Sequence, residues 1–238
     1  MTEYDAAMAN RYLQGRALST VDMARWMDAA RPYLPDAGGR VLDLGAGTGR
    51  FTGVLAAACG ATVVACEPSA AMRAVCPPGT VLVGGMAEAS PFGDGVFDTV
   101  WTSYVLHHVR DPAACGRELR RVLRPGGHLL LRGGFGPVER LPLFRYFPLA
   151  PGPTLASIAA AVPLSMVDRV AVEQVFARDV DELVAKVSTR SLSTLADLPN
   201  SVFQDGMAKL SRDTPDFPVV ETLDLVVFRK DRAPTSRR

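Results

Sequence analysis

The chain has 238 residues, which suits one large domain, and its formal net charge is +1. Because a near-neutral chain has no general attraction to nucleic-acid phosphates, we expect no nucleic-acid partner. The longest apolar runs, 54–66 and 155–167, are too short to span a bilayer, and the N-terminus lacks the apolar stretch of a secretory signal. We therefore expect a single-domain cytoplasmic protein without a membrane partner, and the sequence leaves its oligomeric state open.

Strand and helix patterns alternate from residue 40 onward. Strands are expected at 40–44, 61–67, 80–85, within 96–106, and at 128–132, 172–177 and 219–230. Helices are expected at 50–58, 69–76, 111–123, 180–187 and 200–212. Apolar strands that alternate with helices predict an α/β fold, with a mostly parallel seven-stranded sheet covered on both faces.

Two regions do not follow this rhythm. The first contains a helix with Ser19 as its N-cap and precedes the first strand, so it can fold over the edge of the sheet as a helical lid. The second is rich in Pro, Gly and Phe and follows the fifth strand, as an insertion or substrate lid. The expected parts of the single domain are the helical lid (1–34), the core (40–132), the insertion (133–170) and the C-terminal strands and helices (171–230).

A glycine-rich turn follows the first predicted strand, in the stretch VLDLGAGTGR. Gly45, Gly47 and Gly49 lack side chains, so a ligand can approach the backbone where the next helix begins. Dinucleotide sites usually have the spacing GxGxxG and hold a pyrophosphate. Asp43 would repel a pyrophosphate but would stabilise an amino group or a sulfonium. The charge therefore favours S-adenosylmethionine over a nicotinamide dinucleotide.

Glu67 ends the second predicted strand, downstream of the glycine turn. A carboxylate at this place accepts hydrogen bonds from both ribose hydroxyls of an adenosine cofactor. Taken alone, the position is equally consistent with a solvated acid at a strand end. The glycine turn upstream favours the ribose role.

Four motifs in order carry a resemblance: VLDLGAGTGR, ACEPS, GMAEASPFGDGVFDTVWTSYVLHHV and RELRRVLRPGGHLLL. The chain resembles the class I S-adenosylmethionine-dependent methyltransferases, in the small-molecule branch of ubiquinone- and menaquinone-type enzymes. The resemblance is strong over residues 40–132 and implies a Rossmann-like sheet, S-adenosylmethionine as cofactor and S-adenosylhomocysteine as product.

The resemblance also implies roles for individual residues in binding the cofactor. Asp43 orders the turn and holds the methionine ammonium, Glu67 holds the ribose, and Ser103 touches the methionine part. In the adenine clamp, Met86 replaces the usual acid, so recognition of adenine must depend on backbone groups and packing. The implied cofactor contacts are Tyr12, Arg16, Asp43, Gly45, Ala46, Gly47, Glu67, Pro68, Met72, Met86, Ala87, Glu88 and Ser103.

Several positions keep two readings. His107 and His108 follow the fourth strand, where an imidazole with a pKa near its usual ~6.5 suits a general base, but the pair also fits a packing role. Arg16 could pair with the methionine carboxylate or be a surface arginine. Phe144, Arg145 and Tyr146 could face a planar or acidic substrate, or form the core of their own loop.

The sequence thus predicts an S-adenosylmethionine-dependent methyltransferase for a small molecule, plausible in specialised metabolism, with oxygen or nitrogen favoured as acceptor atom. No metal-binding cluster stands out in the sequence. One alternative is an RNA or protein methyltransferase, which the neutral charge disfavours. Another is an enzyme or regulator on the same fold that binds the cofactor without methylating. The substrate and its regiochemistry stay open.

Overall fold

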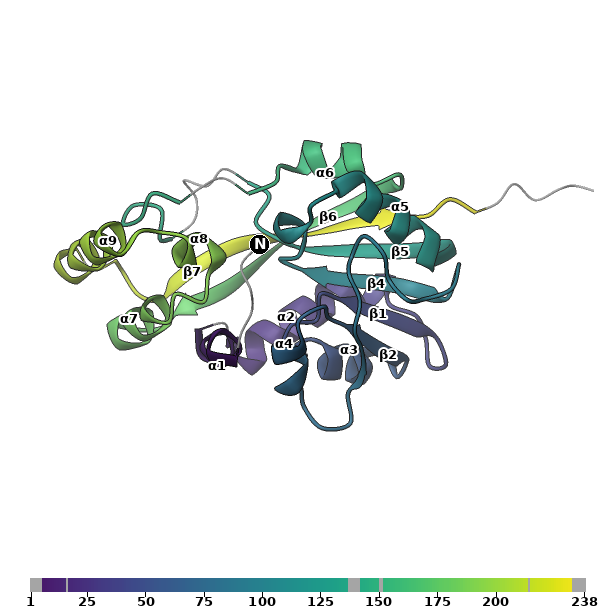
Figure 1. Ribbon diagram of the computed structural model, residues 1–238, viewed down its shortest axis with the longest axis horizontal. Helices are drawn as coiled ribbons and strands as arrows, with labels where there is room; N and C mark the ends of the chain where they lie inside the picture. Colours follow the sequence, from purple (N-terminus) through teal and green to yellow (C-terminus); the bar gives the residue numbers. More distant parts are fainter. Residues whose placement is uncertain (1–5, 16, 137–141, 150–151, 214, 233–238) are drawn as a thin grey trace, which may run out of the picture.

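The computed structural model describes residues 6–15, 17–136, 142–149, 152–213 and 215–232 (Figure 1). Within them lies one seven-stranded sheet in the order β3-β2-β1-β4-β5-β7-β6. Strands β1 to β5 run parallel and β7 runs antiparallel to both β5 and β6, so the expected mostly parallel sheet is confirmed. The strands are β1 (Arg40–Leu44), β2 (Thr62–Cys66), β3 (Val81–Val83), β4 (Phe97–Ser103), β5 (Leu123–Gly133), β6 (Ser165–Ala177) and β7 (Val219–Arg229).

Several helices begin where the sequence supplies a capping side chain. Ser69, Asp111 and Asp179 each accept a backbone N–H of the first turn of the helix that follows, and Ser19 does the same at α2. The helices are α1 (Ala6–Gly15), α2 (Thr20–Ala30), α3 (Thr52–Cys59), α4 (Ala70–Ala74), α5 (Pro112–Val122), α6 (Leu155–Ala161), α7 (Val180–Ser188), α8 (Ser193–Ala196) and α9 (Asn200–Arg212), with short 3-10 turns η1 (Arg31–Tyr33) and η2 (Leu106–His108).

Helices cover both faces of the sheet, with α5 and α6 on one side and α2 and α3 on the other (Figure 1). Leu129 and Leu131 of β5 pack toward α5, whereas Leu130 between them packs toward α2, as the two-residue period of a strand requires. On the α2 side, Trp26 is fully buried. Helix α2, which was expected to be part of a lid, is therefore part of the core.

A third hydrophobic cluster stands apart from the sheet's two faces. It joins residues 142–149 to α7, α8 and α9, and we call this unit the cap. Gly206 of α9 allows the contact at its centre, because a Cβ there would lie 2.2 Å from the ring of Phe147. Phe147 also stacks on Phe203, with ring centroids 5.6 Å apart.

The cap is carried by the two antiparallel strands, which outrun the rest of the sheet. Gly133 at the end of β5 pairs with Asp224, so residues 219–223 of β7 and 172–177 of β6 continue beyond β5. We call this extension the β6–β7 arm; five residues of β7 extend it by roughly 17 Å at about 3.4 Å per residue. The cap sits at its far end, on the side to which the parallel strands point (Figure 1).

Two expected boundaries differ clearly from the structure. Strand β6 begins at Ser165, so residues 165–170 belong to the sheet and not to the insertion, which ends before them. Strand β5 begins at Leu123, directly after α5, and includes the expected helix break at 124–127. The pairing of β4 with β5 shifts register between Phe97 and Thr99, which accommodates that irregular start.

Candidate cofactor site

The glycine turn leaves β1 at the point where the strand order reverses, between β1 and β4, and leads into α3. Ligands of open α/β sheets bind at this point, outside the carboxyl ends of the strands. Its three glycines all have positive φ, but their surroundings differ. A Cβ at Gly45 would lie 2.3 Å from Val105, and one at Gly49 would lie 3.1 Å from Pro77. At Gly47 the nearest described atom is 3.8 Å away, on Tyr12, so Gly47 is the glycine that faces room for a ligand.

Asp43 is almost completely buried at the end of β1, with 3% of its surface exposed. Its Oδ2 accepts a hydrogen bond of 2.7 Å from the Thr52 hydroxyl in the first turn of α3. Burial raises the pKa of Asp43 to about 7, against the lowering effects of this hydrogen bond and of Arg50. A nearby cation would stabilise the ionised form of this buried acid, so the site suits a ligand that carries a positive charge.

Glu67 lies one residue after β2 and binds the glycine turn directly. Its Oε2 accepts the N–H of Gly47 at 3.0 Å, and its Oε1 accepts the N–H of Ser69 at 2.9 Å. Burial raises the pKa of Glu67, while the two backbone hydrogen bonds and Arg73 oppose the rise. Each carboxylate oxygen has two lone pairs, so both can accept a further hydroxyl. The geometry fits a carboxylate that holds ribose and cofactor loop together.

Arg73 is a residue of this site that the sequence did not single out. Its Nη1 donates to the carbonyls of Glu67 and Pro68, at 2.7 and 2.8 Å. Its guanidinium also lies 3.3 Å from the place of a Cβ at Gly84. Arg73 therefore closes the turn after β2 against the loop after β3. A lone arginine in a short helix gives no pattern from which this could be inferred.

The expected adenine clamp lies in the loop after β3. Met86 is exposed, Ala87 is buried, and Glu88 accepts the backbone N–H of Arg110 at 2.9 Å. The carboxylate of Glu88 thus ties this loop to the segment after η2. Met72, expected beside the adenine, is buried in α4, whereas Pro68 is exposed.

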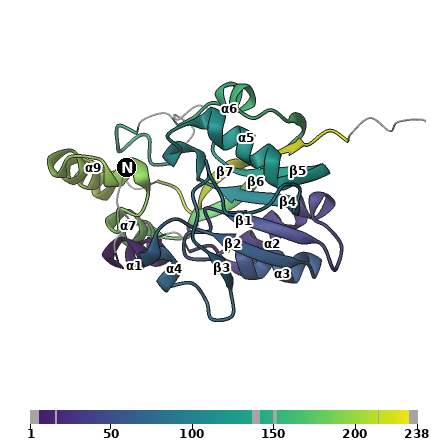
Figure 2. The ribbon, with the colours of Figure 1, turned by 45° about the vertical axis from the view of Figure 1, so that its right-hand side comes forward.

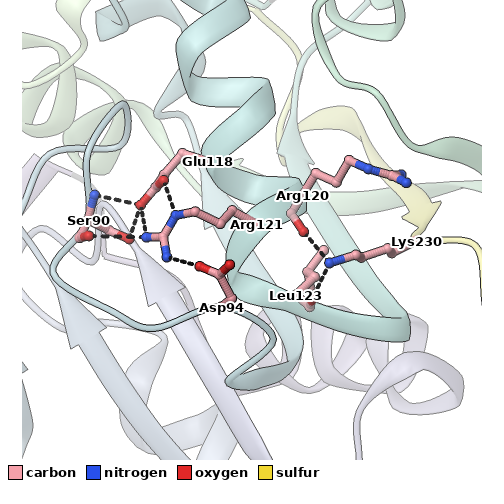
Figure 3. Close-up of polar contacts among 7 residues, drawn as sticks. All are labelled: Ser90, Asp94, Glu118, Arg120, Arg121, Leu123 and Lys230. Atoms are coloured by element: carbon pink, nitrogen blue, oxygen red, sulfur yellow. Dashed lines mark hydrogen bonds and ion pairs between the residues drawn. The ribbon is translucent and has the colours of Figure 1, made fainter. Parts of the chain in front are cut away.

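The same loop is fastened to α5 farther along its length (Figure 3). Glu118 accepts the backbone N–H and the hydroxyl of Ser90, at 2.8 and 2.6 Å. Arg121 donates to both oxygens of Glu118 and to Asp94, so one ion-pair cluster holds the loop at Ser90 and at Asp94. Arg121 lowers the pKa of Glu118, which keeps it ionised. The loop that carries the clamp is therefore anchored to α5 at two points, in addition to the hydrogen bond of Glu88.

The end of β4 supplies Ser103 and a strained backbone. Tyr104 has a φ of 57°, a left-handed conformation that a bulky residue seldom adopts. Its N–H donates to the carbonyl of Arg132 at 3.1 Å, and the Arg132 guanidinium donates to the Ser103 hydroxyl at 3.1 Å. Strain of this kind gathers at functional sites. Arg132 was missed because an arginine after an apolar strand resembles a solvated strand end.

His107 and His108 lie in η2, just beyond this turn. Their ring centroids are 3.9 Å apart, and the ring of His107 lies 6.5 Å from that of Tyr104. His107 is exposed and His108 is half-buried, so His107 is the more accessible of the two. The position fits both readings, a base that faces an acceptor and a pair that shapes the loop.

Helix α1 lies next to the glycine turn. It contacts α4 and α7, and Figure 2 shows these three helices side by side. Tyr12 is half-buried and is the side chain next to Gly47. Arg16 lies outside the described residues, so its expected pairing with the methionine carboxylate stays a prediction.

The structure places the expected substrate contacts of the insertion in the cap. Tyr146 is buried, and its hydroxyl donates to the carbonyl of Asp213 at 2.6 Å. Arg145 pairs with the Asp213 carboxylate at 2.6 Å, and Phe144 is partly exposed. Tyr146 is thus part of the hydrophobic cluster of the cap, which fits the alternative reading. Substrate contact by Phe144, Arg145 or Tyr146 stays a prediction.

The described residues also bear on two other kinds of site. No group of three or more His, Cys, Asp or Glu side chains there is arranged to hold a metal ion. Among the helices in those ranges, none has the length and apolar character needed to cross a membrane.

The comparisons with known proteins agree on one family. The family described as "Methyltransferase domain" matches residues 42–131. Demethylmenaquinone methyltransferase of Mycolicibacterium vanbaalenii is 37% identical over 161 residues, which cover 66% of this chain and 70% of that protein. The chain covers smaller shares, between 46% and 63%, of further relatives at similar identity.

Solved structures show the same fold at low identity. A putative methyltransferase from an antibiotic biosynthesis pathway of Anabaena variabilis superposes with a TM-score of 0.65 at 20% identity, covering 86% of this chain and 96% of that one. The [4+2]-cyclase SpnF superposes with a TM-score of 0.63 at 20% identity, covering 92% and 85%. The matched sequence family, the menaquinone-type relative and the shared fold lead to one conclusion: this chain belongs to the class I S-adenosylmethionine-dependent methyltransferases, of the menaquinone type.

Proposed function

We propose that the chain transfers the methyl group of S-adenosylmethionine to a small-molecule acceptor, with oxygen or nitrogen as the favoured acceptor atom. The observation that carries the proposal is the arrangement around the glycine turn. Asp43, a buried acid with a raised pKa, lies in the strand that leads into the turn, and Glu67 accepts the N–H of Gly47, the glycine with the most open surroundings. This arrangement fits a ligand that combines a cation with a ribose.

In this proposal, the residues of the site divide the cofactor between them. Asp43 attracts the methionine ammonium, and Gly45, Ala46 and Gly47 line the methionine and ribose. Glu67 accepts the ribose hydroxyls, and Ser103 contacts the methionine part. Pro68, Met72, Met86, Ala87 and Glu88 surround the adenine, and Tyr12 and Arg16 close the site from α1.

The chemistry asks little of the protein beyond alignment and exclusion of water. When bound, S-adenosylmethionine supplies a methyl group that its sulfonium has already activated. Holding two reactants in line contributes on the order of 7–11 kcal/mol, whereas a general base contributes about 10²–10⁴-fold in rate. His107 or His108 is the group placed to take the proton of a hydroxyl or amine, and α1 and the cap exclude water.

The acceptor is proposed to bind between the end of β4 and the cap. The cap is built on an arm that rises from the sheet beside β5, and the insertion contributes to it. A relative named for demethylmenaquinone and a neighbour named for antibiotic biosynthesis support a small organic acceptor. The second name also supports a role in specialised metabolism.

A non-methylating enzyme on this fold is the second candidate, because one neighbour of similar fold is named a cyclase. Incubation with methyl-labelled S-adenosylmethionine and small-molecule extracts of the host separates the two. Labelled product together with an equal amount of S-adenosylhomocysteine supports methyl transfer. A product formed without S-adenosylhomocysteine would identify the second candidate, and labelled RNA or protein would identify a macromolecular substrate.

A further inference from the structure

A series of buried and partly buried hydrogen bonds runs from the β6–β7 arm to the end of β4. Gln174 of β6 donates to Glu221 of β7 at 2.5 Å. The Gln174 carbonyl oxygen accepts from Arg132 of β5 at 2.5 Å, and Arg132 donates onward to the Ser103 hydroxyl of β4 at 3.1 Å. Four side chains on four strands thus connect the arm that carries the cap to the serine expected to contact the cofactor.

The donors and acceptors in this series of hydrogen bonds allow only one orientation of the Gln174 amide. Gln174 Oε1 also accepts the indole N–H of Trp26 at 2.8 Å, and both of its partners are groups that only donate. Its Nε2 faces the carboxylate of Glu221, which when ionised only accepts. If the amide were reversed, its N–H₂ group would face the two donors of Trp26 and Arg132, and its oxygen would face the carboxylate of Glu221. The orientation of Gln174, and with it the place of the guanidinium, is therefore fixed.

Aromatic rings enclose the Arg132 guanidinium on the α2 side of the sheet. Its central carbon lies 4.3 Å from the ring centroid of Trp26, 5.2 Å from that of Phe51 and 5.4 Å from that of Tyr104. Only 2% of Arg132 is exposed. Such contacts stabilise a cation and fix the plane of a guanidinium, which the compact ammonium of a lysine cannot reproduce.

Arg132 holds the end of β4 by three separate contacts. Its Nη1 binds the Ser103 hydroxyl, its carbonyl accepts the N–H of Tyr104, and its guanidinium lies below the Tyr104 ring. Tyr104 is the residue with the left-handed backbone, a conformation that costs on the order of 1–3 kcal/mol unless its surroundings enforce it. The contacts of Arg132 are of the kind that enforce it.

We propose that Arg132 is a positioning residue of the cofactor site, which acts through Ser103 and the left-handed turn at Tyr104. Gln174 holds its guanidinium from the arm, so the base of the cap and the floor of the cofactor site keep one relative position. The proposal rests on the proposed function, since it assigns a role toward the cofactor. It adds a link between the element that covers the acceptor and the strand end that presents the cofactor.

Two variants interrupt this series of hydrogen bonds at different points, and a third variant serves as a matched control. Arg132→Lys keeps the charge but loses the planar fork, and Gln174→Met keeps the volume but loses both hydrogen-bonding groups. Arg169→Lys changes an arginine of the same sheet that pairs with Asp224 at 2.8 and 2.9 Å and has no part in this series. S-adenosylhomocysteine affinity is measured by calorimetry well below each variant's unfolding transition, so that loss of stability alone does not change it.

Arg132→Lys and Gln174→Met are each expected to weaken S-adenosylhomocysteine binding about 10-fold, the loss of roughly one hydrogen bond to a charged group. The double variant should bind S-adenosylhomocysteine no more weakly than the single variant with the lower affinity, because both substitutions interrupt the same series of hydrogen bonds. Amide exchange should also become faster in residues 103–109. Arg169→Lys should leave affinity and exchange unchanged.

Unchanged affinity and exchange in both Arg132→Lys and Gln174→Met would overturn the proposal. An equal loss in Arg169→Lys would overturn it too, since affinity would then follow the general stability of the sheet. If Arg132→Lys does not fold, Gln174→Met decides by the same readouts. A wild-type protein that does not bind S-adenosylhomocysteine contradicts the proposed function instead, and amide exchange at 103–109 still tests the positioning role.

Discussion

The preference of the site for a cationic ligand depends on the single carboxyl group of Asp43. Its pKa is raised to about 7 by burial, so in the ligand-free protein the neutral form is favoured below that pH. A raised pKa in the folded state contributes stability at low pH that is lost as the pH rises through about 7. A cationic ligand reverses this preference, because it favours the ionised form.

The affinity for S-adenosylhomocysteine, whose ammonium would face Asp43, should therefore increase between pH 6 and pH 8. Asp43→Asn should bind more weakly at pH 8 and should lose this slope, because its amide does not ionise. Calorimetry at several pH values provides the measurement. A slope that persists in Asp43→Asn would come from another group and would contradict the assignment.

Glu67 has two tasks, since the same carboxylate binds the glycine turn and is proposed to bind ribose. Glu67 accepts the backbone N–H groups of Gly47 and Ser69. Glu67→Gln removes the charge and turns an amide N–H₂ group toward one of these two donors. S-adenosylhomocysteine binding should weaken by ~1–3 kcal/mol, the scale of hydrogen bonds to a charged group. Glu173→Gln, an exposed position of β6, is the control and should bind as the wild type does. Equal affinities in the two variants would remove Glu67 from the site.

The loop after β3 shows how an element is held in place for function. Glu118 and Arg121 of α5 fasten it at Ser90 and Asp94, on the C-terminal side of the expected adenine clamp (Figure 3). Because Arg121 lowers the pKa of Glu118, the stability that this acid contributes is present above its unfolded pKa and is lost as the pH falls.

Glu118→Gln should lower the free energy of unfolding by roughly 1–3 kcal/mol, because it weakens several hydrogen bonds to one charged group. It should also weaken S-adenosylhomocysteine binding, since the clamp loses an anchor. Asp28→Asn is the control: its ion pair with Arg31 is long, at 3.5 Å, and exposed, so the change should be near zero. Denaturant unfolding and calorimetry measure the two effects. Unchanged cofactor binding in Glu118→Gln would show that the anchors do not serve the clamp.

Elements with a strong local signal were predictable from the sequence, and those defined by long-range partners were not. Strands β1 and β2 are apolar and end in chemically informative residues, and the glycine turn has a spacing of its own. The start of β6 was placed too far along the sequence, at residue 172, because the first half of the strand is mostly exposed and residues 165–171 show no apolar period. Arg132 and Gln174 lie 42 positions apart, and only the order of the strands brings them together.

At the scale of the whole molecule, three units meet at the carboxyl edge of the sheet. The core presents the glycine turn, the β6–β7 arm carries the cap, and α1 spans the space between them through its contacts with α4 and α7 (Figure 2). The sequence predicted a lid at the N-terminus and another in the insertion. It could not show that α1 contacts α7 of the cap, because a helix of ten residues contains no information on the partner across from it.

Tyr12 tests whether α1 acts as a lid over the cofactor. Its ring is next to Gly47, whereas Leu13, its neighbour on the same helix, is 44% exposed. Tyr12→Ala should release S-adenosylhomocysteine faster and weaken its binding, by about 10-fold for ~1.4 kcal/mol of lost contact. Leu13→Ala, the matched control, removes a similar amount of helix surface on the solvent side and should change neither rate nor affinity. Stopped-flow displacement gives the dissociation rate. Equal rates in the two variants would mean that α1 covers the site without holding the cofactor, and the closure would then have to come from the cap.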